Sequence, residues 1–203
     1  MIGIIDYGVG NLFSLQSSFQ YLGENVFVSG DEAELNKADR LVLPGVGAFG
    51  DAADKLRRSG MDRFVCDQAA QGKPLLGICL GMQMLFEKSY EYGEHTGLGL
   101  LKGNVIPMAG RISPDLKIPH MGWNGLHILK NNSVLLSGIE NGDYVYFVHS
   151  YFADGCDDAL AAVTDYGTFL TAAVEKDNVF GCQFHPEKSG EVGLKILKAF
   201  CSV

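Results

Sequence analysis

The segment Gly77–Gly81, which reads Gly-Ile-Cys-Leu-Gly, most constrains the fold of this chain because it places a cysteine between two glycines. Pro74–Leu76 before it predicts an interior strand, and Met82–Glu87 after it predicts the first turns of a helix. A sharp turn from strand to helix needs small residues two positions on either side of its centre, so that the chain can fold back closely. The sequence therefore predicts that Cys79 lies at the tip of such a turn.

This position would give the thiol of Cys79 the surroundings of a nucleophile. The following helix directs its first N–H groups and the positive end of its dipole at the sulfur, which favours the reactive thiolate. The alternative is a cysteine that only packs in the core as a small apolar residue. A second segment of the chain decides between them.

That second segment is Gly181–Glu187, which supplies a base and a group to orient it. His185 and Glu187 are separated by one residue, so in an extended conformation both side chains would leave the same face. The carboxylate can then hold the imidazole and fix its tautomer. A cysteine, a histidine and an orienting carboxylate form a catalytic triad in any chain order, because the partners meet in space.

With Cys79, His185 and Glu187 in these roles, the chain resembles the class I (triad) glutamine amidotransferases. Longer strings resemble the glutaminase subunits of imidazole glycerol phosphate synthases; they are Asp6–Leu12, Leu43–Gly47, Cys79–Gln83, Pro119–Asn124, Phe147–Tyr151 and Phe184–Gly190. The string Pro119–Asn124 distinguishes between members of this class. It is expected of these subunits and not of the amidotransferase domains that serve GMP, anthranilate or carbamoyl phosphate synthesis.

The resemblance implies hydrolysis of L-glutamine to glutamate and ammonia. It also implies a heterodimer with a (β/α)₈ synthase (cyclase) subunit, which uses the ammonia to convert the ribulosyl intermediate PRFAR into imidazole glycerol phosphate and AICAR in histidine biosynthesis. Trp123, Asn124 and His120 match positions near that interface. For Trp123, the only tryptophan of the chain, a buried plug in a Gly-Trp-Asn loop is the alternative.

The resemblance also assigns groups to the reaction. An oxyanion formed by attack of Cys79 needs preorganised donors, and the N–H of Leu80 qualifies by its position after the nucleophile. The second donor should come from Val46 or Gly47, in a loop whose family counterpart turns a peptide N–H inward. The alternative is that the glycines beside Val46 only shape a turn.

Substrate contacts are implied for four further residues. Gln83 lies one helical turn after Cys79 and so shares the face of the predicted helix that looks into the site. Glu91 matches the acidic residue expected to hold the α-ammonium group of glutamine, and Ser150 and Tyr151 should face its α-carboxylate. Without the family, each would be read as an ordinary helix or strand residue.

Composition excludes other classes of function. The chain has 203 residues, 16 Lys and Arg against 24 Asp and Glu, and a net charge of −8, which opposes binding to nucleic acid or to an anionic membrane. Its five cysteines are odd in number and form no C-x-x-C motif, which predicts a reducing cytoplasm. No signal peptide, membrane span, metal site or cofactor is predicted.

The hydrophobic pattern predicts an α/β fold in one domain over residues 1–203. Strands alternate with helices in the first half, and short strands dominate the second. The resemblance specifies a three-layer, flavodoxin-like sheet that is mostly parallel, with additional strands in the second half. The predicted strands include 2–5, 25–28, 41–43, 144–148, 171–175 and 179–184, and the predicted helices cover 12–22 with Asn11 as cap, 50–58, 61–71 and 192–200.

Three other functions stay open. One is a glyoxalase or chaperone-like protein with the same cysteine elbow and no synthase partner, and another is a binding subunit without catalysis. The segment Pro44–Gly47, Gln83 and the intact triad oppose both. A closer alternative is a paralogous amidotransferase subunit that supplies ammonia for amidation of a surface-polysaccharide sugar, which the sequence does not distinguish.

Overall fold

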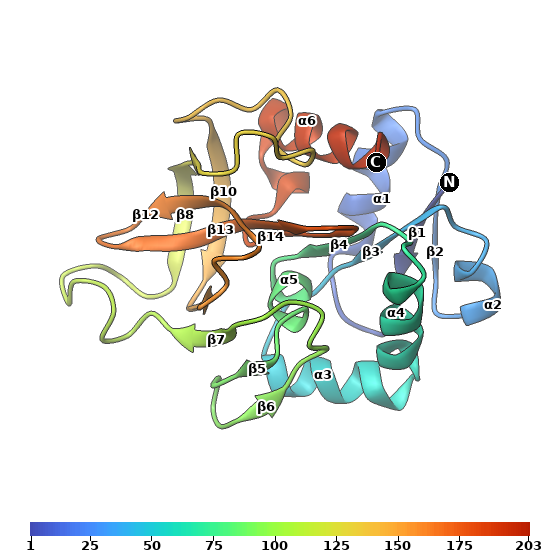
Figure 1. Ribbon diagram of the computed structural model, residues 1–203, viewed down its shortest axis with the longest axis horizontal. Coiled ribbons are helices and arrows are strands. Elements are labelled where there is room, and N and C mark those ends of the chain that lie inside the picture. The colour runs from blue at the N-terminus through green and yellow to red at the C-terminus, as the bar shows by residue number, and fades with distance from the viewer.

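A computed structural model describes residues 1–203, in which a large twisted sheet lies between two layers of helices (Figure 1). The sheet has eight strands. In their order across it, they are β2 (Val26–Ser29), β1 (Ile2–Ile5), β3 (Arg40–Leu43), β4 (Leu75–Ile78), β14 (Val179–Cys182), β13 (Phe169–Lys176), β12 (Leu160–Asp165) and β9 (His127–Ile128).

The first five strands of this order are parallel, and β13, β12 and β9 continue the sheet antiparallel to their neighbours. The parallel part has the flavodoxin-like order, in which the chain starts in the interior of the sheet and extends it in both directions. The predicted fold class is therefore confirmed. The carboxyl ends of β3 and β4 lie side by side, which brings the loops that follow them together.

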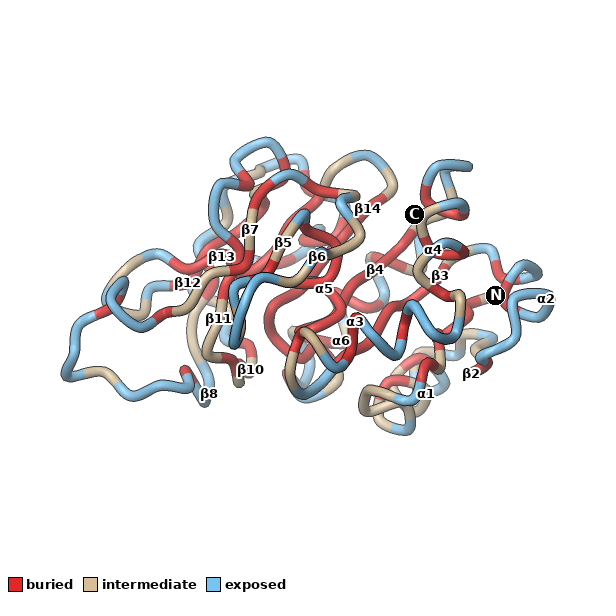
Figure 2. Tube along the Cα trace, turned by 90° about the horizontal axis from the view of Figure 1, so that it is seen from below, coloured by how far each residue is buried: buried red, intermediate tan, exposed pale blue.

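Helices cover both faces of the sheet (Figure 1). One face carries α1 (Leu12–Tyr21) and α6 (Gly190–Cys201); the other carries α2 (Glu32–Leu35), α3 (Phe49–Arg58), α4 (Met61–Ala70) and α5 (Leu80–Met84). Successive strand residues point to opposite cores, as Ile4 and Ile5 do. Strand β4 and helix α5 are accordingly buried along their length, and β3 is buried after its first residue, Arg40 (Figure 2).

Two smaller sheets complete the second half of the chain. Strands β8 (His120–Gly125) and β10 (Tyr144–His149) pair antiparallel, and β11 (Tyr151–Asp154), β7 (Asn104–Pro107), β5 (Lys88–Ser89) and β6 (His95–Thr96) form the other sheet. Because only Ser150 separates β10 from β11, the two small sheets join beside the carboxyl ends of the large one.

Some local expectations were wrong. Asn11 precedes α1 as predicted, but its side chain makes no capping hydrogen bond. Helix α5 ends at Met84, well before Glu87, because the N–H groups of Leu85 and Phe86 bond to carbonyls only three residues back and the chain then turns into β5. Strand β14 ends at Cys182, short of the predicted 184.

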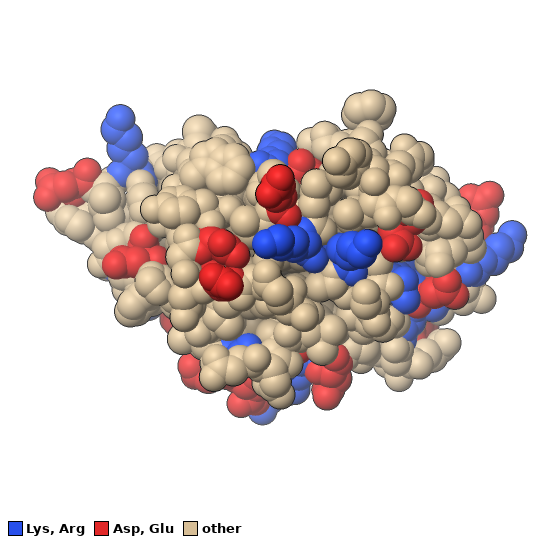
Figure 3. Space-filling model, turned by 90° about the horizontal axis from the view of Figure 1, so that it is seen from above, with Lys and Arg blue, Asp and Glu red and all other residues tan.

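The surface carries no continuous basic face in the view of Figure 3, where acidic and basic side chains are interspersed. This distribution fits the excess of acidic residues in the sequence. No helix of the structure has the length and the apolar character needed to cross a membrane.

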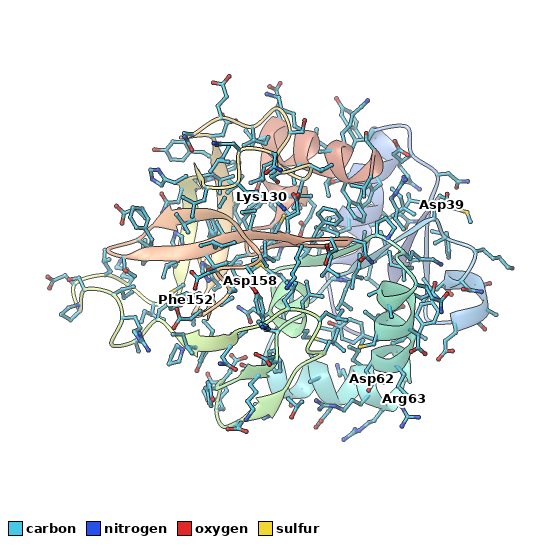
Figure 4. The ribbon with its side chains drawn as sticks, in the orientation of Figure 1. Asp39, Asp62, Arg63, Lys130, Phe152 and Asp158 are labelled. Carbon is cyan, nitrogen blue, oxygen red and sulfur yellow. The ribbon has the colours of Figure 1, made fainter.

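Glu175 is a buried carboxylate that holds the segment after β9 against strand β13. Its side chain is 5% exposed and lies 3.1 Å from Nζ of Lys130, which is labelled in Figure 4. Oε2 accepts hydrogen bonds from the hydroxyl of Ser133 at 2.5 Å and the N–H of Leu135 at 3.1 Å, and Oε1 accepts one from the N–H of Val134 at 3.2 Å. Burial alone would raise the pKa of Glu175, but these contacts outweigh it and lower the pKa.

We therefore predict that Glu175→Gln lowers the free energy of unfolding at pH 7 by about 3 kcal/mol, because an NH₂ group replaces one carboxylate oxygen and leaves buried donors without an acceptor. The lowered pKa means that the carboxylate stabilises the fold above about pH 4, the ordinary pKa of glutamate, and loses this effect as the pH falls further. Urea denaturation measures the change. Lys176→Gln is the control, because this half-buried residue on the same strand makes only a surface ion pair with Asp158; an equal effect of both substitutions would contradict the prediction.

Candidate active site

Cys79 occupies a strained turn between β4 and α5. Its backbone has φ 53° and ψ −111°, a conformation that non-glycine residues rarely adopt. A Cβ atom at Gly77 would lie 2.7 Å from the carbonyl oxygen of Gly81, and one at Gly81 would lie 1.9 Å from the carbonyl oxygen of Leu43. Only glycine fits at either position, so the structure confirms the predicted elbow and its need for both glycines.

His185 and Glu187 form a buried pair, with Nδ1 of the imidazole 2.8 Å from Oε1 of the carboxylate. Their side chains are 3% and 1% exposed. His185 is extended as predicted, with φ −99° and ψ 96°, but the prediction was wrong for Glu187, because Pro186–Lys188 forms a 3₁₀ turn. The pair still meets, since the fixed φ of Pro186 starts the turn and brings Glu187 back toward the ring.

The surroundings of His185 favour its charged form. Burial by itself lowers the pKa of the imidazole, but hydrogen bonds to Cys79 and Glu187 and the negative charges of these two groups raise it to about 9. Because Nδ1 is committed to Glu187, Nε2 is the nitrogen that remains for the sulfur. This arrangement suits an imidazolium that stabilises a thiolate and can give up a proton.

Cys79 and His185 line a cleft of about 310 Å³ at the carboxyl ends of the parallel strands. The predicted oxyanion and substrate residues line the same cleft: Val46, Gly47, Leu80, Gln83, Glu91, Ser150 and Tyr151. Pro119, Val148 and His149, which were given no role from the sequence, complete its wall. No three His, Cys, Asp or Glu side chains gather in a way that could hold a metal ion.

The loop after β3 is anchored at its start and exposed in its middle. The hydroxyl of Tyr7 donates a hydrogen bond of 2.7 Å to the carbonyl of Pro44, at the start of the loop. Val46 is 43% exposed, and Gly47 has φ 94°, which glycine adopts without strain. The exposed part of the loop thus follows closely after an anchored proline. Sequence reasoning missed Tyr7, although it lies within the quoted Asp6–Leu12 string.

A pair of glutamine side chains connects the nucleophile with β11. Gln83 donates from Nε2 to the carbonyl of Tyr151 and to Oε1 of Gln183, both at 3.0 Å, and Nε2 of Gln183 lies 3.8 Å from Sγ of Cys79. Gln183 had no predicted role, but its alternation with Cys182 indicated that the two point in different directions. Cys182 packs in the core between the sheet and helices α1 and α6, as expected.

Glu91 joins the cleft to the start of α3. Its Oε2 accepts a hydrogen bond of 2.6 Å from the N–H of Phe49, the first residue of that helix. Oε1 is not used in this contact. Glu91 therefore places a carboxylate in the wall of the cleft, within the same cavity as Ser150 and Tyr151.

The residues predicted at a partner interface differ in how far they are exposed. Trp123 is 54% exposed and lies on strand β8, so it is neither a buried plug nor part of a loop. Asn124 beside it is half-buried. His120 is only 3% exposed and stacks between Phe147 and Tyr166, with ring centroids 4.8 and 4.1 Å away. His120 is therefore buried beneath the face that carries Trp123, and the interface role given to it from the resemblance stays a prediction.

Comparison with known proteins agrees with this geometry. The family model "Glutamine amidotransferase class-I" matches residues 4–202. The chain therefore belongs to the class I glutamine amidotransferases. Over 99% of its length the fold also matches a solved structure described as PurLQS from Thermotoga maritima, covering 97% of that chain with a TM-score of 0.74 at 22% identity.

Within the class, the chain belongs with proteins named imidazole glycerol phosphate synthase subunit HisH. It is 53% identical over 201 residues to the protein of that name from Caldanaerobacter subterraneus subsp. tengcongensis, covering 98% of this chain and 97% of the relative. It is 54% identical over 200 residues to that of Lactococcus lactis subsp. lactis, covering 98% and 96%.

The geometry of the triad predicts that Glu187→Gln lowers the pKa of His185 from about 9 toward its ordinary value of about 6.5, because the charged partner is lost while burial remains. Titration of the ring by NMR measures the change. Glu191→Gln removes an exposed carboxylate on α6 and should leave the pKa of His185 unaltered. An unaltered pKa in Glu187→Gln as well would contradict the assigned role of the pair.

Proposed function

We propose that residues 1–203 form one glutaminase domain that hydrolyses L-glutamine to glutamate and ammonia. The observation that carries this proposal is the strained elbow at Cys79, which opens into the same cleft as His185. Oε1 of Glu187 forms a hydrogen bond with Nδ1 of that histidine. Nucleophile, acid–base group and orienting carboxylate are thus fixed before any substrate enters.

Catalysis proceeds through a covalent thioester. The thiolate of Cys79 attacks the side-chain amide carbon of glutamine, and the carbonyl electrons move to oxygen. Collapse of this intermediate breaks the C–N bond, and the imidazolium of His185 gives its proton to the departing ammonia. The neutral imidazole then takes a proton from water as that water attacks the thioester, which releases glutamate and restores the thiolate and imidazolium.

The oxyanion is stabilised by backbone donors on two loops. Leu80 is the first residue of α5, so its N–H has no acceptor within the helix. The second donor is the N–H of Val46 or Gly47, in the loop whose start Tyr7 anchors. The exposure of Val46 and the conformational freedom of Gly47 support a peptide that rotates inward when the site is activated.

Glutamine is held by the walls of the cleft. The carboxylate of Glu91 is suited to its α-ammonium group. Ser150 and Tyr151, at the junction of β10 and β11, are placed to meet its α-carboxylate. Gln83 faces the cleft from the first turn of α5 and fixes the amide end of the substrate.

The ammonia passes to a (β/α)₈ synthase subunit that docks as the second chain of a heterodimer. The name of the relatives supports this partner and favours histidine biosynthesis over amidation of a sugar. Exposed Met121 and Trp123, both on β8, supply apolar anchors of the kind that interfaces use. Asn124 lies on the same strand, and its side chain points to the opposite face. The cytoplasmic location inferred from the cysteines stays a prediction.

We predict that Cys79→Ala abolishes glutamine-dependent synthesis by the reconstituted pair, by roughly 10³-fold or more, because no other group can form the thioester. Synthesis from added ammonium salt should persist, since the synthase is intact. Product formation from each nitrogen source measures both. Cys66→Ala, a half-buried cysteine on α4, should retain both activities. Loss of both activities in Cys79→Ala would contradict the proposed division of labour.

The loop after β3 leads to a prediction about how the synthase controls the glutaminase activity. The chain alone should hydrolyse glutamine slowly, and synthase with bound acceptor should raise kcat much more than it lowers KM, because the missing donor acts on the transition state. If the N–H of Val46 is the second donor, Val46→Pro removes it and should abolish this activation, whereas Val46→Ala retains the N–H and the activation. Steady-state glutaminase kinetics with and without the partner measure the effect. Full glutaminase activity of the chain alone would rule out control by rotation of this loop.

A further inference from the structure

Two buried histidines that have no part in the triad lie between strand β8 and the cleft. They face each other across the β8–β10 pair, where His120 is in register with His149. Their exposed fractions are 3% and 6%. Nδ1 of His120 lies 3.0 Å from Nε2 of His149, and Nδ1 of His149 lies 2.9 Å from the carbonyl oxygen of Tyr151.

The partners of the two rings determine where their protons lie. A carbonyl can only accept, so Nδ1 of His149 must donate to Tyr151. Burial lowers the pKa of His120 to about 4 and that of His149 to about 3, so both rings are neutral and each has one donor and one acceptor. Nε2 of His149 therefore accepts from Nδ1 of His120, whose own Nε2 must accept in turn.

The donor to His120 is the half-buried side chain of Asn124, on the same face of β8. Nδ2 of Asn124 lies 3.4 Å from Nε2 of His120 and also donates to the carbonyl of Asp165 at 2.8 Å. Oδ1 of Asn124 accepts from the N–H of Gly125 at 2.9 Å, which fixes the orientation of the amide. Asn124 alternates with the exposed Trp123 along β8, so this strand carries the start of the chain of hydrogen bonds on one face and the proposed docking residue on the other.

The other end reaches the nucleophile. The carbonyl of Tyr151 accepts from His149 and also from Nε2 of Gln83, which uses its second N–H on Gln183. Gln183 is fully buried and contacts Sγ of Cys79 through Nε2. The path from Asn124 to the sulfur is thus continuous, and each donor and acceptor along it is determined by its neighbours.

We propose that His120 and His149 are positioning residues, which together with Asn124 form a relay of fixed hydrogen-bond direction from strand β8 to the substrate cleft. The relay holds the carbonyl of Tyr151, and through Gln83 and Gln183 it sets the position of Cys79. Movement of β8 when the synthase docks therefore reaches the active site through these side chains. This inference rests on the proposed glutaminase and its partner.

A crossed pair of substitutions separates this relay from simple packing. His120→Phe keeps a ring between Phe147 and Tyr166 but has no donor for His149. His120→Asn loses the stacking but places an amide N–H where Nδ1 was. In the complex with synthase and acceptor, we expect His120→Phe to lower the glutaminase kcat about tenfold or more, with KM changed less than about threefold, and His120→Asn to retain more of the kcat.

A glutaminase kcat that falls from wild type to His120→Asn and further to His120→Phe supports the relay. A lower kcat in His120→Asn than in His120→Phe, or no effect of either variant, overturns it. Melting temperatures and the affinity for the synthase are measured for both variants. If a loss of folding or of docking lowered kcat, the ranking of the variants by kcat would follow their stability or affinity and not the presence of the donor. Ammonium-dependent synthesis serves as the control for the intact partner.

A second measurement on the chain itself does not depend on any activity. Ring ¹⁵N chemical shifts show which nitrogen of a histidine carries the proton. We expect His120 and His149 to be neutral at pH 6 with the proton on Nδ1 in both. A proton on Nε2 of either ring would overturn the relay, even in a protein with full glutaminase activity. The expected tautomers in a protein without that activity would leave the relay standing and overturn the proposed function.

Discussion

The close backbone contact between Gly81 and the carbonyl of Leu43 is the constraint on which the site depends. It lets the first turn of α5 pack against the end of β3, where any side chain at Gly81 would collide with the backbone. The strained φ of Cys79 follows from this contact, because β4 is held on both sides by parallel strands and cannot relax. The N–H of Cys79 bonds to the carbonyl of Cys182 at 2.7 Å, which locks the turn to β14.

The acid–base half of the site is fixed by a different set of backbone bonds. The N–H of His185 donates to the carbonyl of Tyr146 on β10, and the hydroxyl of Ser189 donates to the carbonyl of His185 at 2.7 Å. Ser189 also accepts from the N–H of Tyr146. His185 is therefore positioned by the small β8–β10 sheet as well as by β14, so the same sheet that carries Trp123 supports the catalytic base.

Three histidines of this protein have the same side chain but different pKa values, because their surroundings differ. His185 is buried beside two anionic partners, and its pKa is raised. His120 and His149 are buried among rings, amides and carbonyls, and their pKa values are lowered. Desolvation opposes the charge on all three, and only a facing negative charge reverses it. The first can therefore transfer protons, while the other two can only orient their neighbours.

The sequence by itself determined the parallel half of the sheet, the elbow at Cys79 and the partnership of His185 with Glu187, because strand and helix periodicity, paired glycines and a His-Pro-Glu string are local signals. Resemblance to a family supplied the residues predicted to contact the substrate, and these line the cleft. Only the tertiary structure decided that His120 is buried and that Gln183 touches the nucleophile. Burial and side-chain contact depend on which distant strands pair and which faces they cover, and that information is not contained in any short segment of the chain.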